Sequence, residues 1–229
     1  MTADPFHVAS DALSEFSGRV TDLARPFVTF LPVSGASIST FGAFLGPETV
    51  SATDDRAGRI DELQFDLGEG PCWDALSTRL PVLEPNVADT AEWPAFTRAI
   101  REEDVGAIFA FPLALGPLEI GAVDLYSDRP LTLTLQQQRQ TLALSEIVSR
   151  ILLRHAIADA DTSHASTFSR RLVHQATGMV LAQLDTTPED AYLIIQARAF
   201  SESRSMREIA EDIIERRITF SALPNEGTP

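Results

Sequence analysis

The sequence predicts an α+β domain followed by a bundle of three helices. Two observations carry this prediction. Up to residue 158, helical patterns alternate with short β-like runs, whereas from residue 169 onward apolar residues recur only at helical spacing. The chain has 229 residues, 44% of them hydrophobic, and is therefore long enough for two domains that each bury a core.

The first element is a predicted helix over residues 6–27, because seven apolar side chains fall there at helical spacing. They are Phe6, Ala9, Leu13, Phe16, Val20, Leu23 and Phe27. Two β-like runs follow at 36–41 and 49–53, and a helical stretch covers 56–65. This order of elements starts an α+β pattern.

A turn at 68–75 opens the next helix, which reaches Arg79, since Pro71 suits a first helical position. A short strand at 80–84 and a helix at 94–103 complete the middle of the domain.

Two nearly apolar runs, 107–115 and 118–126, are separated by a Gly-Pro break and predict a β-hairpin. A long helix then runs from Thr134 past Ala156. Its apolar residues cover more than one face, so we expect it to pack on the sheet and also on another helix.

Three amphipathic helices are predicted beyond residue 168. The first carries apolar residues on one broad face, the second starts at the Thr187-Pro188 cap, and the third starts at a capping box of Ser205 and Glu208. The predicted organisation is a domain at 1–158, a linker at 159–168 that is either helical or a flexible hinge, a helical domain at 169–222, and a disordered tail at 223–229.

Charge limits the partners of this chain. Its net charge is −15, and all 18 basic residues are Arg, so phosphate repulsion argues against broad, nonspecific nucleic-acid binding. Residues 168–220 hold 7 Arg and 8 acidic residues, a net charge of −1. The C-terminal part can therefore present a local Arg face.

Cysteine count and hydropathy indicate a cytoplasmic protein. The single Cys excludes an internal disulfide and fits a reducing compartment. The sequence has neither an apolar run of 18 residues nor a signal-peptide pattern, so no membrane partner is expected.

The C-terminal segment resembles the ANTAR domain, a three-helix RNA-binding module of bacterial antiterminators. The resemblance rests on Ala176 and Gly178, on the run Pro188 to Tyr192, on Ala199, and on the run Arg207 to Ala210. At Thr177 the family usually has Lys. A close approach of a helix or of an RNA backbone is a reason for a glycine at position 178.

The N-terminal segment resembles the GAF domains that precede ANTAR in actinobacterial regulators. Its landmarks are the runs 67–72, 92–96, 111–113 and 120–126. The resemblance implies a central antiparallel sheet of about six strands with helices on both faces, and a small-molecule ligand in some members. The sequence names no such ligand.

No catalytic or metal-binding constellation is found in the sequence. The four His residues are scattered, Cys72 lacks a CxxC partner, and no nucleotide-binding loop is present. We therefore expect no enzyme. Cys72, Trp73 and Trp93 are candidates for a ligand pocket or a redox site, and the alternative is that all three fill the core.

Arginine suits phosphate contacts and stacks on unpaired bases. The candidate RNA-binding residues are Arg170, Arg171, His174, Thr177, Arg198, Arg204 and Arg207. The resemblance implies a signal-responsive antitermination regulator that binds paired stem-loops in nascent transcripts, and no DNA partner is expected. The helices at 6–27 and 134–157 can form a four-helix bundle between two protomers, so we also expect a homodimer. The alternative is a ligand-binding GAF module whose C-terminal helices mediate oligomerisation or bind a protein.

Overall fold

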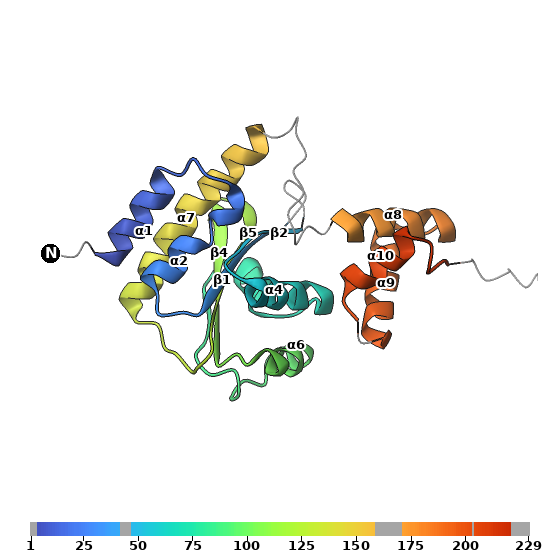
Figure 1. Cartoon of the computed structure of the whole chain (residues 1–229), viewed down its shortest axis with the longest axis horizontal. Coiled ribbons are helices and arrows are strands. Elements are labelled where there is room, and N and C mark those ends of the chain that lie inside the picture. Colours follow the sequence, from blue (N-terminus) through green and yellow to red (C-terminus); the bar gives the residue numbers. More distant parts are fainter. Residues whose placement is uncertain (1–3, 42–46, 159–170, 203, 221–229) are drawn as a thin grey trace, which may run out of the picture. The chain divides into compact units, whose positions relative to one another are not determined.

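The computed structural model describes residues 4–41, 47–158, 171–202 and 204–220. The chain divides into two compact units, Met1–Ser169 and Arg170–Pro229. Figure 1 shows the mixed sheet-and-helix unit and the all-helical unit. Each unit is described by itself below.

The N-terminal unit is built on one antiparallel sheet with the strand order β2-β1-β5-β4-β3. The strands are β1 (Gly35–Thr40), β2 (Glu48–Ala52), β3 (Val82–Glu84), β4 (Ala107–Leu115) and β5 (Leu118–Ser127). The β4–β5 hairpin predicted at the Gly-Pro break is confirmed. The described residues hold five strands, where about six were expected.

Helices cover both faces of the sheet (Figure 1). One face carries α1 (Pro5–Ser14), α2 (Arg25–Phe30) and α7 (Leu135–Ala158), and the other carries α4 (Asp55–Leu67), α5 (Pro71–Thr78) and α6 (Pro94–Ile100). The predicted double packing of the long helix is confirmed, since α7 contacts both β4 and α1.

The two faces of the sheet differ in polarity. The face under α7 is mainly apolar and belongs to the main core through residues such as Ile38, Phe109 and Val123. On the other face, Ser37 lies directly opposite Asp124 in the β1–β5 register, and opposed residues of antiparallel strands share a face. The sheet is therefore mainly apolar on one side but polar at the centre of the other.

The single helix predicted over residues 6–27 is wrong. The chain forms α1, a 3₁₀ turn at Val20–Asp22 (η1) and α2, and α1 packs against α2. Ser17-Gly18 lowers helix propensity at the break, and Pro26 lies in the first turn of α2, where its missing N–H is tolerated. The apolar residues of the pattern still contact the core, so the periodicity was sound although the helix is interrupted.

The C-terminal unit consists of α8 (Arg171–Leu184), α9 (Pro188–Glu202) and α10 (Met206–Ile214), packed around a core of its own. The capping box of Ser205 and Glu208 is confirmed. At the N-terminus of α9 the backbone N–H of Asp190 donates to the Thr187 hydroxyl at 3.1 Å, as its cap position predicts.

After α10 the chain turns back across α8. The backbone N–H of Arg217 donates to the Asp212 carbonyl and that of Arg216 to the Ile213 carbonyl, while Arg216 is left-handed with φ 60°. These two bonds form a Schellman motif, and they fix where the segment after α10 runs.

Candidate functional site

The predicted basic residues do not form one surface. His174 lies in the first turn of α8 and Gln183 in its last, about 14 Å apart at 1.5 Å per residue. The backbone N–H of Phe220 donates to Gln183 at 2.7 Å, and the Arg198 guanidinium lies 5.9 Å from the centre of the Phe220 ring. Arg198 therefore lies at the end of α8 that is far from His174.

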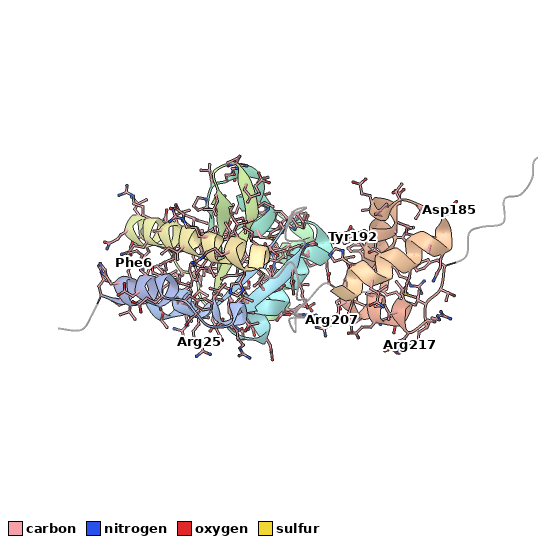
Figure 2. All side chains as sticks on the ribbon, turned by 90° about the horizontal axis from the view of Figure 1, so that it is seen from above. Phe6, Arg25, Asp185, Tyr192, Arg207 and Arg217 are labelled. Atoms are coloured by element: carbon pink, nitrogen blue, oxygen red, sulfur yellow. The ribbon has the colours of Figure 1, made fainter. Side chains whose placement is uncertain are left out.

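Figure 2 places Arg207 and Arg217 along the same axis. Arg207 is at the end of the unit where α8 begins, and Arg217 is at the end where α8 finishes. Arg207 thus lies at the same end of the unit as His174. Its Nε lies 3.3 Å from Glu211 Oε1 in an exposed pair.

Arg204 connects α9 and α10 through ion pairs with both helices. Its Nη2 donates to Asp212 at 2.7 Å and its Nη1 lies 3.2 Å from Glu202. Arg217 donates to the same Asp212 carboxylate from beyond the end of α10. The hydrogen bond from Arg204, and then that from Arg217, lowers the pKa of the Asp212 carboxyl below its ordinary value. The Asp212 carboxylate therefore binds one arginine that precedes α10 and one that follows it.

Thr177, which was predicted as an RNA contact, is largely buried in the ANTAR unit and not at its surface. It is 9% exposed, and its hydroxyl donates to the Val173 carbonyl at 2.7 Å. It belongs to the buried stripe of α8 with Val173, Ala176 and Val180. Arg170 and the side chain of Arg171 lie outside the described residues.

The exposed side of α8, called the α8 face below, consists of His174, Gln175, Gly178 and Ala182. A Cβ added to Gly178 would meet no atom within 4 Å. Among the described residues of this unit, no helix makes the expected close approach to this glycine. Glycine inside a helix costs about 1 kcal/mol relative to alanine, and packing within the unit gives no reason for it.

The two tryptophans and Cys72 all donate hydrogen bonds to other residues of the N-terminal unit. Cys72 is completely buried beside Phe41, Phe65 and Ala122, and its backbone N–H donates to the Gln64 side chain at 2.8 Å. The Trp73 indole donates to the Gln64 carbonyl at 2.8 Å. Cys72 and Trp73 therefore both donate a hydrogen bond to Gln64. Their surroundings favour the core-filling interpretation over a reactive thiol.

Trp93 lies apart from this pair. Its indole donates to Asp74 of α5 at 2.9 Å, and its backbone is left-handed with φ 49°, directly before α6. Two of the three candidates therefore belong to α5 and the third is bonded to it, but they do not line one cavity among the described residues.

A buried polar layer between α4 and the sheet was missed from the sequence. Gln64 donates to Asp124 Oδ2 at 2.9 Å, and Thr49 donates to Asp61. Asp124 Oδ1 and Ser39 Oγ are buried and accept no hydrogen bond among the described residues. The signal was an aspartate inside an apolar strand, at the fifth residue of the run Ile120 to Tyr126.

Burial, and then the negative charge of Asp61, raises the pKa of the Asp124 carboxyl well above its ordinary value. A recess beside it, lined partly by Ile60 and Tyr126, encloses no volume that would hold a water molecule. Asp124 therefore holds a proton more strongly in the folded protein than in the unfolded chain.

The ANTAR domain family matches residues 165–214, which include all of α8, α9 and α10. The C-terminal unit is an ANTAR domain. An ANTAR domain indicates RNA binding and a regulatory role. The α8 face and Arg207 are exposed parts of this ANTAR domain.

Solved structures give the fold of the N-terminal unit. It is similar to the GAF domain of an Acinetobacter phosphoenolpyruvate-protein phosphotransferase (12% identity, TM-score 0.53, 71% of this chain and 100% of that one). The GAF domain of the corresponding Coxiella burnetii protein is similar at 10% identity and TM-score 0.53, covering 68% of this chain and 95% of that one. The unit that precedes the ANTAR domain has the GAF fold.

A third similar structure is the chromophore-binding domain of a bacteriophytochrome from R. palustris, at 8% identity and TM-score 0.52. The match covers 68% of this chain but 61% of that domain. No curated protein matches the chain. In the part of the chain that the structure describes, none of the helices has the length and apolar character needed to cross a membrane.

Proposed function

We propose that this protein is a signal-responsive transcription antitermination regulator of the cytoplasm, which binds stem-loops of nascent RNA, and not DNA, through its ANTAR domain. The observation that carries the proposal is the α8 face. Position 178 on this face is a glycine, although nothing in the unit packs against it and requires the absence of a side chain. Binding would hold the transcript in a form that excludes a terminator hairpin. The GAF unit would supply the signal control and no catalysis.

The chemistry of the α8 face suits a nucleic-acid backbone. An exposed glycine lets a sugar-phosphate chain approach the helix more closely than any side chain allows. His174 is exposed beside it, and Arg207 lies at the same end of the ANTAR domain (Figure 2). Arginine donates in a fork that matches phosphate oxygens and stacks on unpaired bases of loops.

Arg207→Ala should weaken the binding of hairpin RNA by roughly 1–3 kcal/mol and lower the slope of affinity against salt by about 1. The loss of the exposed Arg207–Glu211 pair itself should cost only about 0.3–0.5 kcal/mol of stability. The measurement is a titration of fluorescent stem-loop RNA with the full chain at several salt concentrations.

Arg150→Ala is the matched control, because Arg150 also forms an exposed pair four residues apart, with Glu146 of α7. It should leave RNA affinity unchanged. Equal affinity of the parent and the folded Arg207→Ala variant would remove Arg207 from the RNA surface. No hairpin binding by the parent would favour the alternative function, an ANTAR domain that mediates oligomerisation or binds a protein partner.

The proposal includes a homodimer formed by the N-terminal unit. Exposed apolar side chains occur on the outer helices of that unit, at Val8 of α1 and at Leu142 and Ile157 of α7. Two such helices from each protomer can form a four-helix contact. A dimer would present two ANTAR domains to paired stem-loops, which would then bind with avidity.

Truncation to residues 1–158 should leave this dimer intact at micromolar concentration, because the helices that carry the contact are retained. Light scattering gives the mass directly. A truncated chain with the mass of one protomer, from a dimeric parent, would move the interface to the ANTAR domain.

A further inference from the structure

Gln64 of α4 connects three segments inside the N-terminal unit. Its side-chain amide donates to Asp124 of β5 at 2.9 Å, and its side-chain oxygen accepts the backbone N–H of Cys72 at 2.8 Å. Its backbone carbonyl accepts the Trp73 indole at 2.8 Å. Gln64 itself is completely buried. One residue therefore links the sheet to the first turn of α5.

The loop between α4 and α5 packs closely on this glutamine. Gly70 in that loop has φ 139°, and a Cβ added to it would lie 2.7 Å from both Cγ and Oε1 of Gln64. The Trp73 ring in turn lies 5.1 Å from the Phe41 ring and 5.2 Å from the Phe65 ring, measured between centroids. A displacement of Gln64 therefore disturbs the start of α5 and the ring contacts of Trp73.

Asp124, at the sheet end of this connection, lacks the partners that an ionised carboxylate needs. Its Oδ1 is buried and accepts no hydrogen bond among the described residues. The recess beside it encloses no volume that would hold a water molecule. The two arginines of α4, Arg56 and Arg59, bind Asp128 and Glu103 instead. An ionised Asp124 would thus be a buried charge without compensation, which proteins avoid by protonation.

The titratable groups that face Asp124 bring no positive charge. Helix α4 contributes Asp61, α5 contributes the Cys72 thiol, and β5 contributes Tyr126, whose hydroxyl donates to the N-cap residue of α4. The neighbouring strands add none, since Glu48 of β2 belongs by its register to the other face of the sheet. Burial, and then the negative charge of Asp61, therefore raise the pKa of the Asp124 carboxyl.

We propose that Asp124 is a pH-sensitive switch, whose neutral carboxyl keeps α4 and the start of α5 closed on the sheet and whose ionisation opens them. Loss of the proton leaves a charge that only water can compensate, and the closed layer has no room for water. Gln64 then leaves the strand and releases Cys72 and Trp73, a local opening of the fold. The face under α7 is mainly apolar and stays packed.

The switch opens toward alkaline pH. In the open state water hydrates the carboxylate, so its pKa returns toward the ordinary value of about 3.9, whereas burial raises the pKa of the closed state. The equilibrium constant for opening should therefore rise about tenfold per pH unit above about pH 3.9 and level off once the pH exceeds the closed-state pKa. The opening concerns the N-terminal unit alone, and only its use as the signal of an antitermination regulator rests on the proposed function.

The test measures the exposure of the single thiol in the full chain. Cys72 is completely buried, so an aromatic disulfide reagent reaches it only in the open state. At each pH the labelling rate is divided by that of the same chain unfolded in urea, which removes the ionisation of the thiol itself. Between about pH 5 and pH 9 this ratio should rise at least about tenfold in the parent. It should stay level in Asp124→Asn, which keeps the bond from Gln64 and cannot ionise.

The matched control places an equally buried thiol on the helix that covers the other face of the sheet. Ser149 of α7 is completely buried, and Ser149→Cys in a Cys72→Ala background exchanges one oxygen atom for sulfur. Its labelling ratio should stay level over the same pH range. An equal rise at both positions would overturn the proposal, because it would report unfolding of the whole unit.

Asp61→Asn keeps the proposal testable if Asp124→Asn does not fold. It removes the negative charge beside Asp124, so the rise should end at a lower pH than in the parent. A level ratio in the parent, the same rise in Asp124→Asn, or an Asp61→Asn profile identical to that of the parent would each overturn the switch. RNA takes no part in these measurements, so their failure leaves the proposed function intact, and a lack of hairpin binding leaves the switch intact.

Discussion

Gly178→Ala is expected to stabilise the ANTAR domain and, at the same time, to weaken its binding of hairpin RNA. The added methyl group meets no atom of the protein, so only the helix propensity changes, by about 1 kcal/mol in favour of folding. The same methyl group would hold an RNA backbone away from the α8 face. We expect affinity to fall about tenfold, or about 1.4 kcal/mol.

Stability and binding must be measured in the same full-length chain. Hydrogen–deuterium exchange of the α8 amides reports the local free energy of opening, and titration of labelled stem-loop RNA reports binding. Opposite signs of the two changes separate this prediction from simple unfolding, which would lower both quantities.

Ala182→Gly provides the inverse control on the same face, one turn further along α8. It should cost about 1 kcal/mol of helix stability and open more space without adding any atom. Unchanged affinity in Gly178→Ala would show that RNA approaches the ANTAR domain elsewhere, and the glycine would then have no function on the α8 face.

Asp124→Asn is expected to raise the stability of the N-terminal unit at alkaline pH. The folded pKa of Asp124 is raised, so its contribution to stability is complete below the unfolded pKa, about 3.9, and is lost as the pH rises through the folded pKa. Asparagine keeps the bond from Gln64 and cannot ionise. At pH 8 we expect a gain of about 1 kcal/mol, which corresponds to roughly 2–4 °C in Tm.

Tryptophan fluorescence can follow this change, because Trp73 and Trp93 both belong to the N-terminal unit. The parent should lose stability between mildly acidic and alkaline pH, and the variant should lose less. Asp11→Asn, at an exposed position of α1, is the control and should follow the parent. If Asp124→Asn also follows the parent across this range, the carboxyl is not protonated in the folded state.

Periodicity and turn chemistry predicted most of the fold. Both capping signals, the hairpin and the double packing of α7 follow from local residue patterns, and the structure has them. Local patterns failed at residues 15–25, because an apolar period continues across a break that Ser17-Gly18 and Pro26 impose on the backbone.

The functional surface was harder to predict, since it depends on partners that are distant in sequence. Nothing next to Arg204 in the sequence shows that Asp212, eight residues later, binds it. Thr177 is buried, whereas the next residue, Gly178, is exposed. Helical spacing alone could not show on which side of this boundary Thr177 lies. The buried layer at Asp124 required the register of β1 against β5, which brings Ser37 opposite the carboxylate.

The shared carboxylate at Asp212 gives the ANTAR domain an acid response opposite to that of the GAF unit. Its lowered pKa means that its contribution is present above the unfolded pKa and is lost as the pH falls through the folded value. Acidification would therefore weaken the bonds of Asp212 to Arg204 and Arg217 only below about pH 3.9, whereas Asp124 takes up its proton above that pH. As the pH falls, the thermal transition of the GAF unit should first rise, and that of the ANTAR domain should fall afterwards, so that the two transitions change in separate pH ranges.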